Sequence, residues 1–164
     1  MKHLLLATFF LAATSLGFAQ EKAPKSPEVT VQNKDIKVVY GQPSKRGRVI
    51  FGTLEPFGKV WRTGANKATE ITFNRNMIFG GKPVKKGTYT LFTIPDPKTW
   101  TVILNGKLGQ WGAFDYDKNK GEDVLSVKVP RVPLTSSVEK LTFSLPAGAV
   151  VMEWDDTKIA VPVK

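Results

Sequence analysis

The sequence predicts an all-β protein: a single antiparallel β-sandwich, jelly-roll-like, with about nine to eleven short strands and at most one short helix. Apolar residues recur at every second position in several segments, including 125–129 and 141–145, which is the period of a half-buried strand. Turn-forming pairs such as Gly80-Gly81 and Asn105-Gly106 separate these segments at short intervals. No segment has a sustained helical period, so the pattern favours short antiparallel strands.

Each strand is placed by alternation within it and by turn residues at its ends. Leu91 and Phe92 are adjacent and both apolar, so their strand is expected to be covered on both faces. Residues 155–158 are expected to turn the last hairpin, and a short helix would fit at 59–65 or 108–113. Strand-like patterns occur at 29–31, 36–40, 48–51, 70–74, 77–79, 83–84, 88–94, 100–104, 125–129, 141–145, 150–154 and 159–163.

Residues 1–19 have the parts of a secretory signal peptide. Lys2 and His3 supply a positive start, residues 4–16 are mostly apolar, and Gly17 and Ala19 are small residues suited to cleavage. A membrane anchor is the alternative, but the apolar run is shorter than the roughly 20 residues of a membrane span. We therefore expect a signal peptide at 1–19, a flexible mature N-terminus at 20–28 and one β-sandwich domain at 29–164. The protein is expected to be periplasmic or secreted, with no transmembrane span after signal removal.

The amino-acid composition excludes several kinds of chemistry. His3 is the single histidine and would leave with the signal peptide, and the chain has no cysteine. The mature protein would then lack Ser-His-Asp and Cys-His nucleophilic sets, disulfides, and the nitrogen and sulfur ligands of the usual zinc, copper, haem and iron–sulfur sites. No cofactor is expected.

One segment has the spacing of oxygen ligands in a calcium loop. Asp115, Asp117 and Asn119 follow a D-x-D-x-N pattern. However, Lys120 stands where such a loop needs glycine, and Ser126 stands where it needs a bidentate glutamate. A solvated turn is the favoured interpretation, so no metal is assigned and these three residues are kept only as a calcium candidate.

The net charge is strongly positive, with 24 Lys and Arg against 14 Asp and Glu, or +10 formally. The basic residues are scattered, with local concentrations at 45–48 and 82–86. No recognition helix, zinc finger or aromatic RNA-binding motif accompanies them. We interpret the charge as a solvated basic surface and expect no nucleic-acid partner.

The stretch 60–73 combines more kinds of hydrogen-bonding side chain than any other, around Gly64, which is expected to turn the chain with a positive φ. Two interpretations stay open, with a small margin for the first. In a structural loop, Trp61 fills the core edge, Arg62 pairs with a carboxylate such as Glu70, and Asn66 pins the turn. In a pocket, Arg62 and Asn66 hold an anion or a sugar hydroxyl. The candidate ligand-binding residues are Trp61, Arg62, Asn66, Thr69, Glu70 and Trp111.

Trp111 joins this set because it lies in the irregular, glycine-flanked segment 109–114, where an exposed aromatic ring could cover the apolar face of a sugar. Trp100 and Trp154 alternate with apolar residues and are expected in the core.

Several runs resemble the bacterial exported family catalogued as domain of unknown function 2911. The runs are Tyr40-Gly41-Gln42-Pro43, Val60-Trp61-Arg62-Thr63-Gly64-Ala65-Asn66, Gly109-Gln110-Trp111-Gly112 and, near the C-terminus, Met152 with Trp154-Asp155. The resemblance covers nearly all of the mature chain and implies an exported protein of Bacteroidota-type bacteria with one β domain. It implies no catalytic residue.

Three functional hypotheses follow. The first is a non-catalytic binding module for a glycan or small anionic ligand. The second is a carboxylate-dependent hydrolase of envelope polysaccharide, which needs two carboxylates facing one cleft. The third is a structural or protein-interaction domain of the cell envelope. The enzyme hypothesis is the less favoured, and the carboxylates open to it are Glu55, Glu70, Asp115, Asp117, Glu122 and Asp123.

Overall fold

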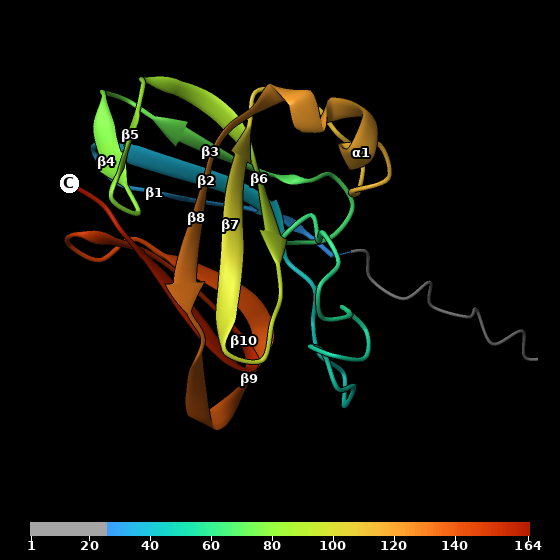
Figure 1. Ribbon diagram of the computed structural model, residues 1–164. Coiled ribbons are helices and arrows are strands. Elements are labelled where there is room, and N and C mark those ends of the chain that lie inside the picture. Colours follow the sequence, from blue (N-terminus) through green and yellow to red (C-terminus); the bar gives the residue numbers. More distant parts are fainter. Residues whose placement is uncertain (1–25) are drawn as a thin grey trace, which may run out of the picture.

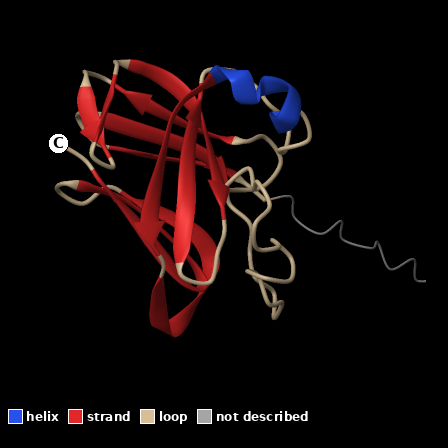
Figure 2. Ribbon diagram, in the orientation of Figure 1, coloured by secondary structure: helices blue, strands red, loops and turns tan. Residues whose placement is uncertain are grey.

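The computed structural model describes residues 26–164, which form ten strands and one short helical segment. Most of the chain is strand, and the helical segment is the single blue element in Figure 2. The elements are β1 (Glu28–Gln32), β2 (Ile36–Gly41), β3 (Thr69–Phe73), β4 (Met77–Phe79), β5 (Lys82–Val84), β6 (Gly87–Ile94), β7 (Thr99–Asn105), α1 (Tyr116–Asn119), a 3-10 turn (Lys120–Glu122), β8 (Asp123–Pro130), β9 (Val132–Ser144) and β10 (Ala149–Pro162).

The first layer is a six-stranded antiparallel sheet in the order β1-β2-β3-β6-β7-β8 (Figure 1). Its strands are neighbours in the order in which they occur along the chain, and the β4–β5 hairpin lies between β3 and β6 in sequence. Alternation decides which face each residue occupies. In β3, Ile71 and Phe73 are fully buried, whereas Glu70 and Thr72 face outward and are half-buried.

The second layer is built on the long β9–β10 hairpin and is widened on both sides by further strand-like pairing. On one side, Ile78 of β4 exchanges backbone hydrogen bonds of 2.8 and 3.0 Å with Lys164. On the other, Lys45 N–H donates to Glu139 O at 2.7 Å, and Leu141 N–H donates to Pro43 O at 3.0 Å. The chain therefore passes from the first layer to the second directly after β2, and the predicted antiparallel sandwich is confirmed.

Between the layers lies a continuous apolar core with an aromatic cluster at one end. Trp100 and Trp154 are 0% and 1% exposed, as their alternation predicted. Phe51 packs edge-on against both at centroid distances of 4.7 and 6.0 Å, and Trp61 stacks on Trp154 at 5.8 Å.

A smaller apolar cluster lies on the outer face of the first layer. Phe92, Ile103 and Ala68 are buried there beneath Ala113 and Tyr116, next to α1. The prediction that Leu91 and Phe92 are covered on both faces is confirmed, since Leu91 belongs to the main core and Phe92 to this cluster.

Two expected elements were wrong. Residues 48–51 do not form a strand, because Gly47 and Gly52 adopt positive φ and a loop carries Ile50 into the core. Residues 155–158 do not turn the last hairpin, because β10 continues through them and the chain reverses after Ser144. Asp155 is instead a bulge residue with φ 54°, and its carboxylate accepts the Ile50 N–H at 3.2 Å.

The short helix lies at Tyr116–Asn119 rather than at 59–65 or 108–113. Both expected positions are held in extended pairing, by a bridge between Trp61 and Thr93 and another between Lys67 and Trp111. The signal peptide at 1–19 and most of the expected flexible N-terminus lie outside the described residues, and β1 already includes Glu28. Across 26–164 no helix is long and apolar enough to span a membrane.

Candidate ligand-binding groove

The segment 42–68 joins β2 to β3 and descends along one side of the sandwich, below α1 (Figure 1). Two glycines let it pack directly on the end of β2. A Cβ on Gly41 would lie 2.0 Å from Ala65 O, and one on Gly64 would lie 2.9 Å from Thr69 Oγ1. The expectation that Gly64 has a positive φ was wrong, because Thr63 and Asn66 carry that conformation, at 55° and 64°.

Trp61 and Thr69 hold this segment in place from behind. Trp61 is 2% exposed, and its backbone exchanges hydrogen bonds of 2.7 and 3.0 Å with Thr93. Thr69 is fully buried, and its hydroxyl donates to Thr63 O at 2.8 Å. Their contacts are with the protein interior, so they fix the position of Arg62 and Asn66 between them.

Arg62 lines a cavity of about 290 Å³ together with Arg48 and Glu55. Within the described chain, the Arg62 side chain has no hydrogen bond or ion pair, and its Nε is buried without a partner. The pairing of Arg62 with Glu70, the example expected for a closed loop, is not formed; Glu70 accepts the Gly109 N–H at 3.0 Å. A buried guanidinium nitrogen without a partner needs an explanation, and a bound anion would supply one.

Glu55 faces the same cavity from a tight loop. Its backbone N–H donates to Ile50 O and its carbonyl accepts the Gly52 N–H, both at 2.9 Å. Burial raises the pKa of the Glu55 carboxyl to about 7, although the charges of Arg62 and Arg48 act in the opposite direction. Near neutral pH the carboxyl is therefore divided between its neutral and ionised forms.

Arg48 and Trp154 also line this cavity. Arg48 Nε and Nη2 donate to Lys45 O at 2.9 Å and to Ser44 O at 2.7 Å, which fixes the guanidinium and leaves its other N–H groups available. Trp154 brings the aromatic cluster to the cavity wall. An apolar wall lowers the local dielectric and strengthens any charge interaction inside.

A second cavity of about 350 Å³ adjoins the first and shares Ser26, Ala65 and Asn66 with it. Asn66 Nδ2 donates to Ser26 O at 3.3 Å, and Trp111, 61% exposed, lines the cavity opposite. A third cavity, of about 250 Å³, shares Glu28, Gly41 and Lys67 with the second and extends to Val39, Glu70 and Gly109. We call the three neighbouring cavities the groove.

The structure thus distributes the six predicted residues along one groove and its supporting wall. Arg62 and Asn66 share the first cavity, Asn66 and Trp111 share the second, and Glu70 lines the third. Trp61 and Thr69 lie behind them. Arg48 and Trp154 were not predicted as site residues, and Glu55 was named only among the carboxylates open to the hydrolase hypothesis. The available signal for Glu55 was a single carboxylate within the otherwise apolar run Leu54-Glu55-Pro56-Phe57.

The calcium candidate does not assemble an oxygen cage. Asp115 forms an ion pair of 2.9 Å with Lys118, and Asn119 Nδ2 donates to Gln110 Oε1 at 3.1 Å. Asp117 lies in the first turn of α1. Nowhere in 26–164 do three or more His, Cys, Asp or Glu side chains gather as potential metal ligands.

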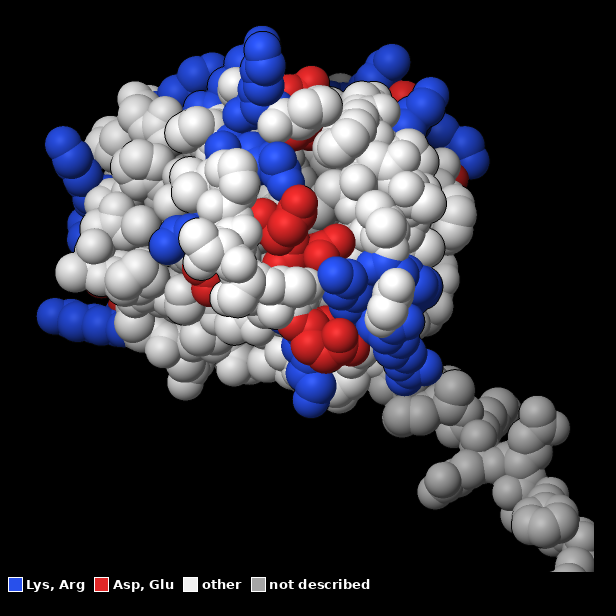
Figure 3. Space-filling model, turned by 90° about the horizontal axis from the view of Figure 1, so that it is seen from below, with Lys and Arg blue, Asp and Glu red and all other residues white. Residues whose placement is uncertain are grey.

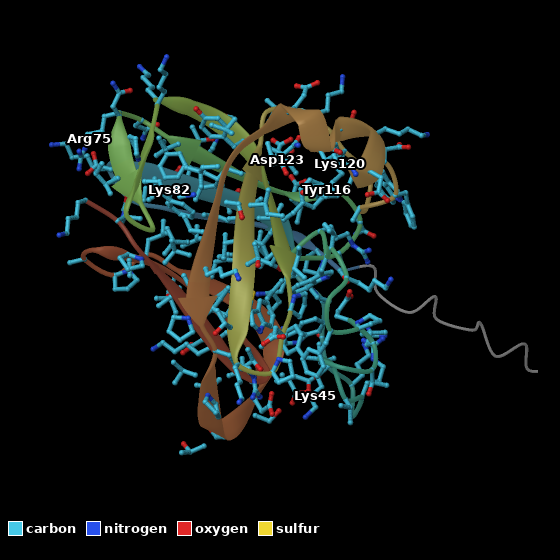
Figure 4. All side chains as sticks on the ribbon, viewed as in Figure 1. Lys45, Arg75, Lys82, Tyr116, Lys120 and Asp123 are labelled. Carbon is cyan, nitrogen blue, oxygen red and sulfur yellow. The ribbon has the colours of Figure 1, made fainter. Side chains whose placement is uncertain are left out.

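The lower end of the sandwich carries charges of both signs. Seen from below, Asp and Glu gather in the middle of this face beside several Lys and Arg side chains (Figure 3). Lys45, labelled at this end in Figure 4, pairs with Asp155 at 2.6 Å. Burial works against ionisation of Asp155, but hydrogen bonds from Lys45, Ile50 N–H and Ser137 lower the pKa of this carboxyl overall. Lys45 and Asp155 therefore pair with each other, whereas Arg62 has no ion pair within the described chain.

Fold and groove together define a small β-sandwich with a preformed, partly polar groove beside its longest connecting segment. The chain belongs to the family described as "Protein of unknown function (DUF2911)", whose model matches residues 23–163. The sequence resemblance to that family is therefore confirmed. No match is found among curated proteins or among solved structures.

Proposed function

We propose that this protein is an exported, non-catalytic binding module whose ligand carries an anionic group that docks on Arg62. The observation that carries the proposal is the buried Arg62 Nε, which lacks a partner in a cavity that also holds Arg48 and Glu55. A carboxylate, sulfate or phosphate would accept hydrogen bonds from the planar guanidinium and offset its desolvation. Export rests on the signal-peptide pattern at 1–19 and gives the module a periplasmic or extracellular ligand.

Glu55 gives this site a dependence on pH. When protonated, its carboxyl can donate a hydrogen bond to an anion; when ionised, it repels one. Since burial holds the pKa of Glu55 at about 7, the affinity for an anion should fall as the pH rises through 7. The site would therefore take up a proton together with its ligand.

The test is calorimetric titration with glucuronate, acetate, sulfate and phosphate at pH 6 and pH 8. Arg62→Ala should weaken binding by at least roughly tenfold, and Arg62→Lys should weaken it less. Arg75→Ala is the matched control, because Arg75 is exposed and pairs with Asp35 far from the groove (Figure 4). Equal binding by wild type and Arg62→Ala, or no binding of any of the anions, would refute the proposal.

A carboxylate-dependent hydrolase has one specific observation in its favour. Glu28 and Glu70 line the same cavity, so two carboxylates face one part of the groove. Such an enzyme should release reducing ends from an envelope polysaccharide and lose this activity in both Glu28→Gln and Glu70→Gln.

A protein-interaction domain would bind its partner through the exposed apolar side chains of Leu108, Trp111 and Phe114.

A further inference from the structure

We propose that the ligand is a short linear oligosaccharide with one acidic group at one end, lying along the whole groove from Arg62 to Glu70. This inference rests on the proposed function, because the acidic group is the anion that docks on Arg62. It adds the class of ligand, its direction in the groove and the residues that hold its neutral part.

The three cavities of the groove follow one another without interruption. The cavities of about 290, 350 and 250 Å³ adjoin in that order, and the middle cavity shares lining residues with each of the other two. Asn66 belongs to the first and second cavities, and Lys67 to the second and third. Each cavity is near or below the small end of known small-molecule sites, about 300 Å³, so a ligand that filled all three would be elongated.

Charged side chains of opposite sign predominate at opposite ends of the groove. Arg48 and Arg62 line the first cavity together with Glu55. Glu28 and Lys67 both line the second and third cavities, and Glu70 lines the third, so acidic groups outnumber basic ones at that end. A chain with an anion on every unit would be attracted at the first end and repelled at the second. Carboxylates accept hydrogen bonds from hydroxyl groups, so the second end suits a neutral, hydroxyl-rich chain.

Trp111 presents an aromatic side chain to the middle cavity. Its side chain is 61% exposed and borders the middle cavity, while the backbone around it is held by two hydrogen bonds. Ala68 N–H donates to Gln110 O at 2.9 Å, and Gly112 N–H donates to Asn66 O at 3.0 Å. An exposed indole on a hydrogen-bonded backbone, beside Asn66 in the middle cavity, combines an apolar ring face with an amide, which matches a sugar ring with its C–H face and its hydroxyl groups.

An acidic peptide fits the groove less well than an oligosaccharide. Extended peptides commonly bind by adding a strand to a free sheet edge. At its acidic end the groove instead crosses the outer face of the first layer, where Glu28 lies opposite Gly41 and Glu70 lies opposite Val39 in the strand register. There Val39 and Glu70 belong to the inner strands β2 and β3, which are paired on both sides within the sheet.

The primary experiment is a chain-length series. Glucuronic acid and oligosaccharides of two to four rings, each with one terminal glucuronic acid and otherwise neutral sugars, are titrated into the protein by calorimetry. Affinity should rise on the order of tenfold between one and three rings. Trp111→Ala should remove most of this gain, so that affinity rises little with chain length. Phe114→Ala is the matched control, since Phe114 is 80% exposed in the same segment but does not line the groove.

The charge order is tested with Glu28→Gln and Glu70→Gln. Both variants should weaken binding of the three-ring ligand severalfold and strengthen binding of an oligogalacturonate, in which every ring is acidic. Gln at position 70 retains an oxygen acceptor for the Gly109 N–H, so the loop should keep its position. Glu122→Gln, outside the groove, is the control and should change neither affinity.

The outcomes separate the two proposals. If glucuronic acid binds through Arg62 but affinity is independent of chain length or of Trp111, the oligosaccharide is wrong and the anion site stands. If oligogalacturonate binds wild type as tightly as the singly charged ligand of equal length, the charge order is wrong. If none of these ligands nor the small anions bind, both proposals fail together.

Discussion

Two chain segments border the groove, and they treat their buried polar groups in opposite ways. At the end of β7, where the first of these segments begins, Asn105 is fully buried and satisfied: its amide donates to Asn119 O and Asp123 Oδ1, both at 2.8 Å. Its carbonyl oxygen accepts from Lys107 N–H at 2.9 Å and Gln110 Nε2 at 3.1 Å. Tyr116, labelled beside Asp123 in Figure 4, donates to the Asp123 carboxylate at 2.7 Å.

In the segment 42–68, by contrast, some buried polar groups lack hydrogen-bond partners within the described chain. Arg62 keeps a buried nitrogen without a partner, and Glu55 is buried enough for its pKa to rise to about 7. A closed hydrogen-bond network fixes one structure, whereas buried polar groups without protein partners are costly unless a ligand or water meets them. The two segments therefore differ in whether the buried polar atoms of Asn105 and Arg62 find partners among residues 26–164.

The largest effect is expected from Gly41→Ala, which tests how the binding segment is anchored. The new Cβ would lie 2.0 Å from Ala65 O, a backbone atom that cannot move without displacing the whole segment. We expect a loss of about 3 kcal/mol or more in the free energy of unfolding, measured with chemical denaturant. Gly121→Ala, which meets no atom within 4 Å, should be close to wild type. A stable Gly41→Ala protein would show that this close packing is not needed.

The second-largest effect on the free energy of unfolding is expected from Asn105→Ala, which is compared with Arg62→Met in the other segment. Asn105→Ala leaves several buried partners unpaired and should cost about 2–3 kcal/mol. Arg62→Met removes no protein hydrogen bond and keeps an apolar stem, so its unfolding free energy should stay within about 0.5 kcal/mol of wild type or rise. If Arg62→Met is as destabilising as Asn105→Ala, Arg62 is a structural residue and the distinction fails.

The smallest effect is expected from Glu55→Gln and is visible only as a dependence on pH. Between the ordinary pKa of 4.5 and about 7, the folded protein holds a proton on Glu55 that the unfolded chain releases, so stability falls as pH rises. Gln removes this slope and should make the variant more stable above pH 7, by roughly 1–2 kcal/mol after allowance for partial exposure. Denaturant unfolding at pH 5 and 8 measures the slope. Identical slopes in wild type and variant would contradict a buried Glu55.

Much of the fold could be predicted because its signals are local. Alternation in 125–129 and 141–145 decides which face of a strand is buried, whatever the rest of the chain does. The errors arose where turn residues serve tertiary contacts. Asp155 resembles a turn residue, yet its carboxylate holds the Ile50 N–H and Lys45 across the sandwich, and the strand continues through it.

The site was predicted in part for the same reason. Arg62 and Asn66 were identified because unusual residues lie close together in sequence, and Trp111 because glycines flank it. Glu55 and Arg48 lie in a loop whose path depends on Gly47 and Gly52, so nothing in their own neighbourhood placed them next to Arg62.

The sequence alone determined the antiparallel β class, the family, and the absence of cysteine, because these follow from residue identity and spacing. Only the tertiary structure decided that the Arg62 side chain has no hydrogen-bond partner among residues 26–164, that Glu70 accepts the Gly109 N–H, and that three cavities adjoin along one groove. Whether a buried polar group is satisfied depends on atoms brought together from distant parts of the chain, and local pattern carries no information about them.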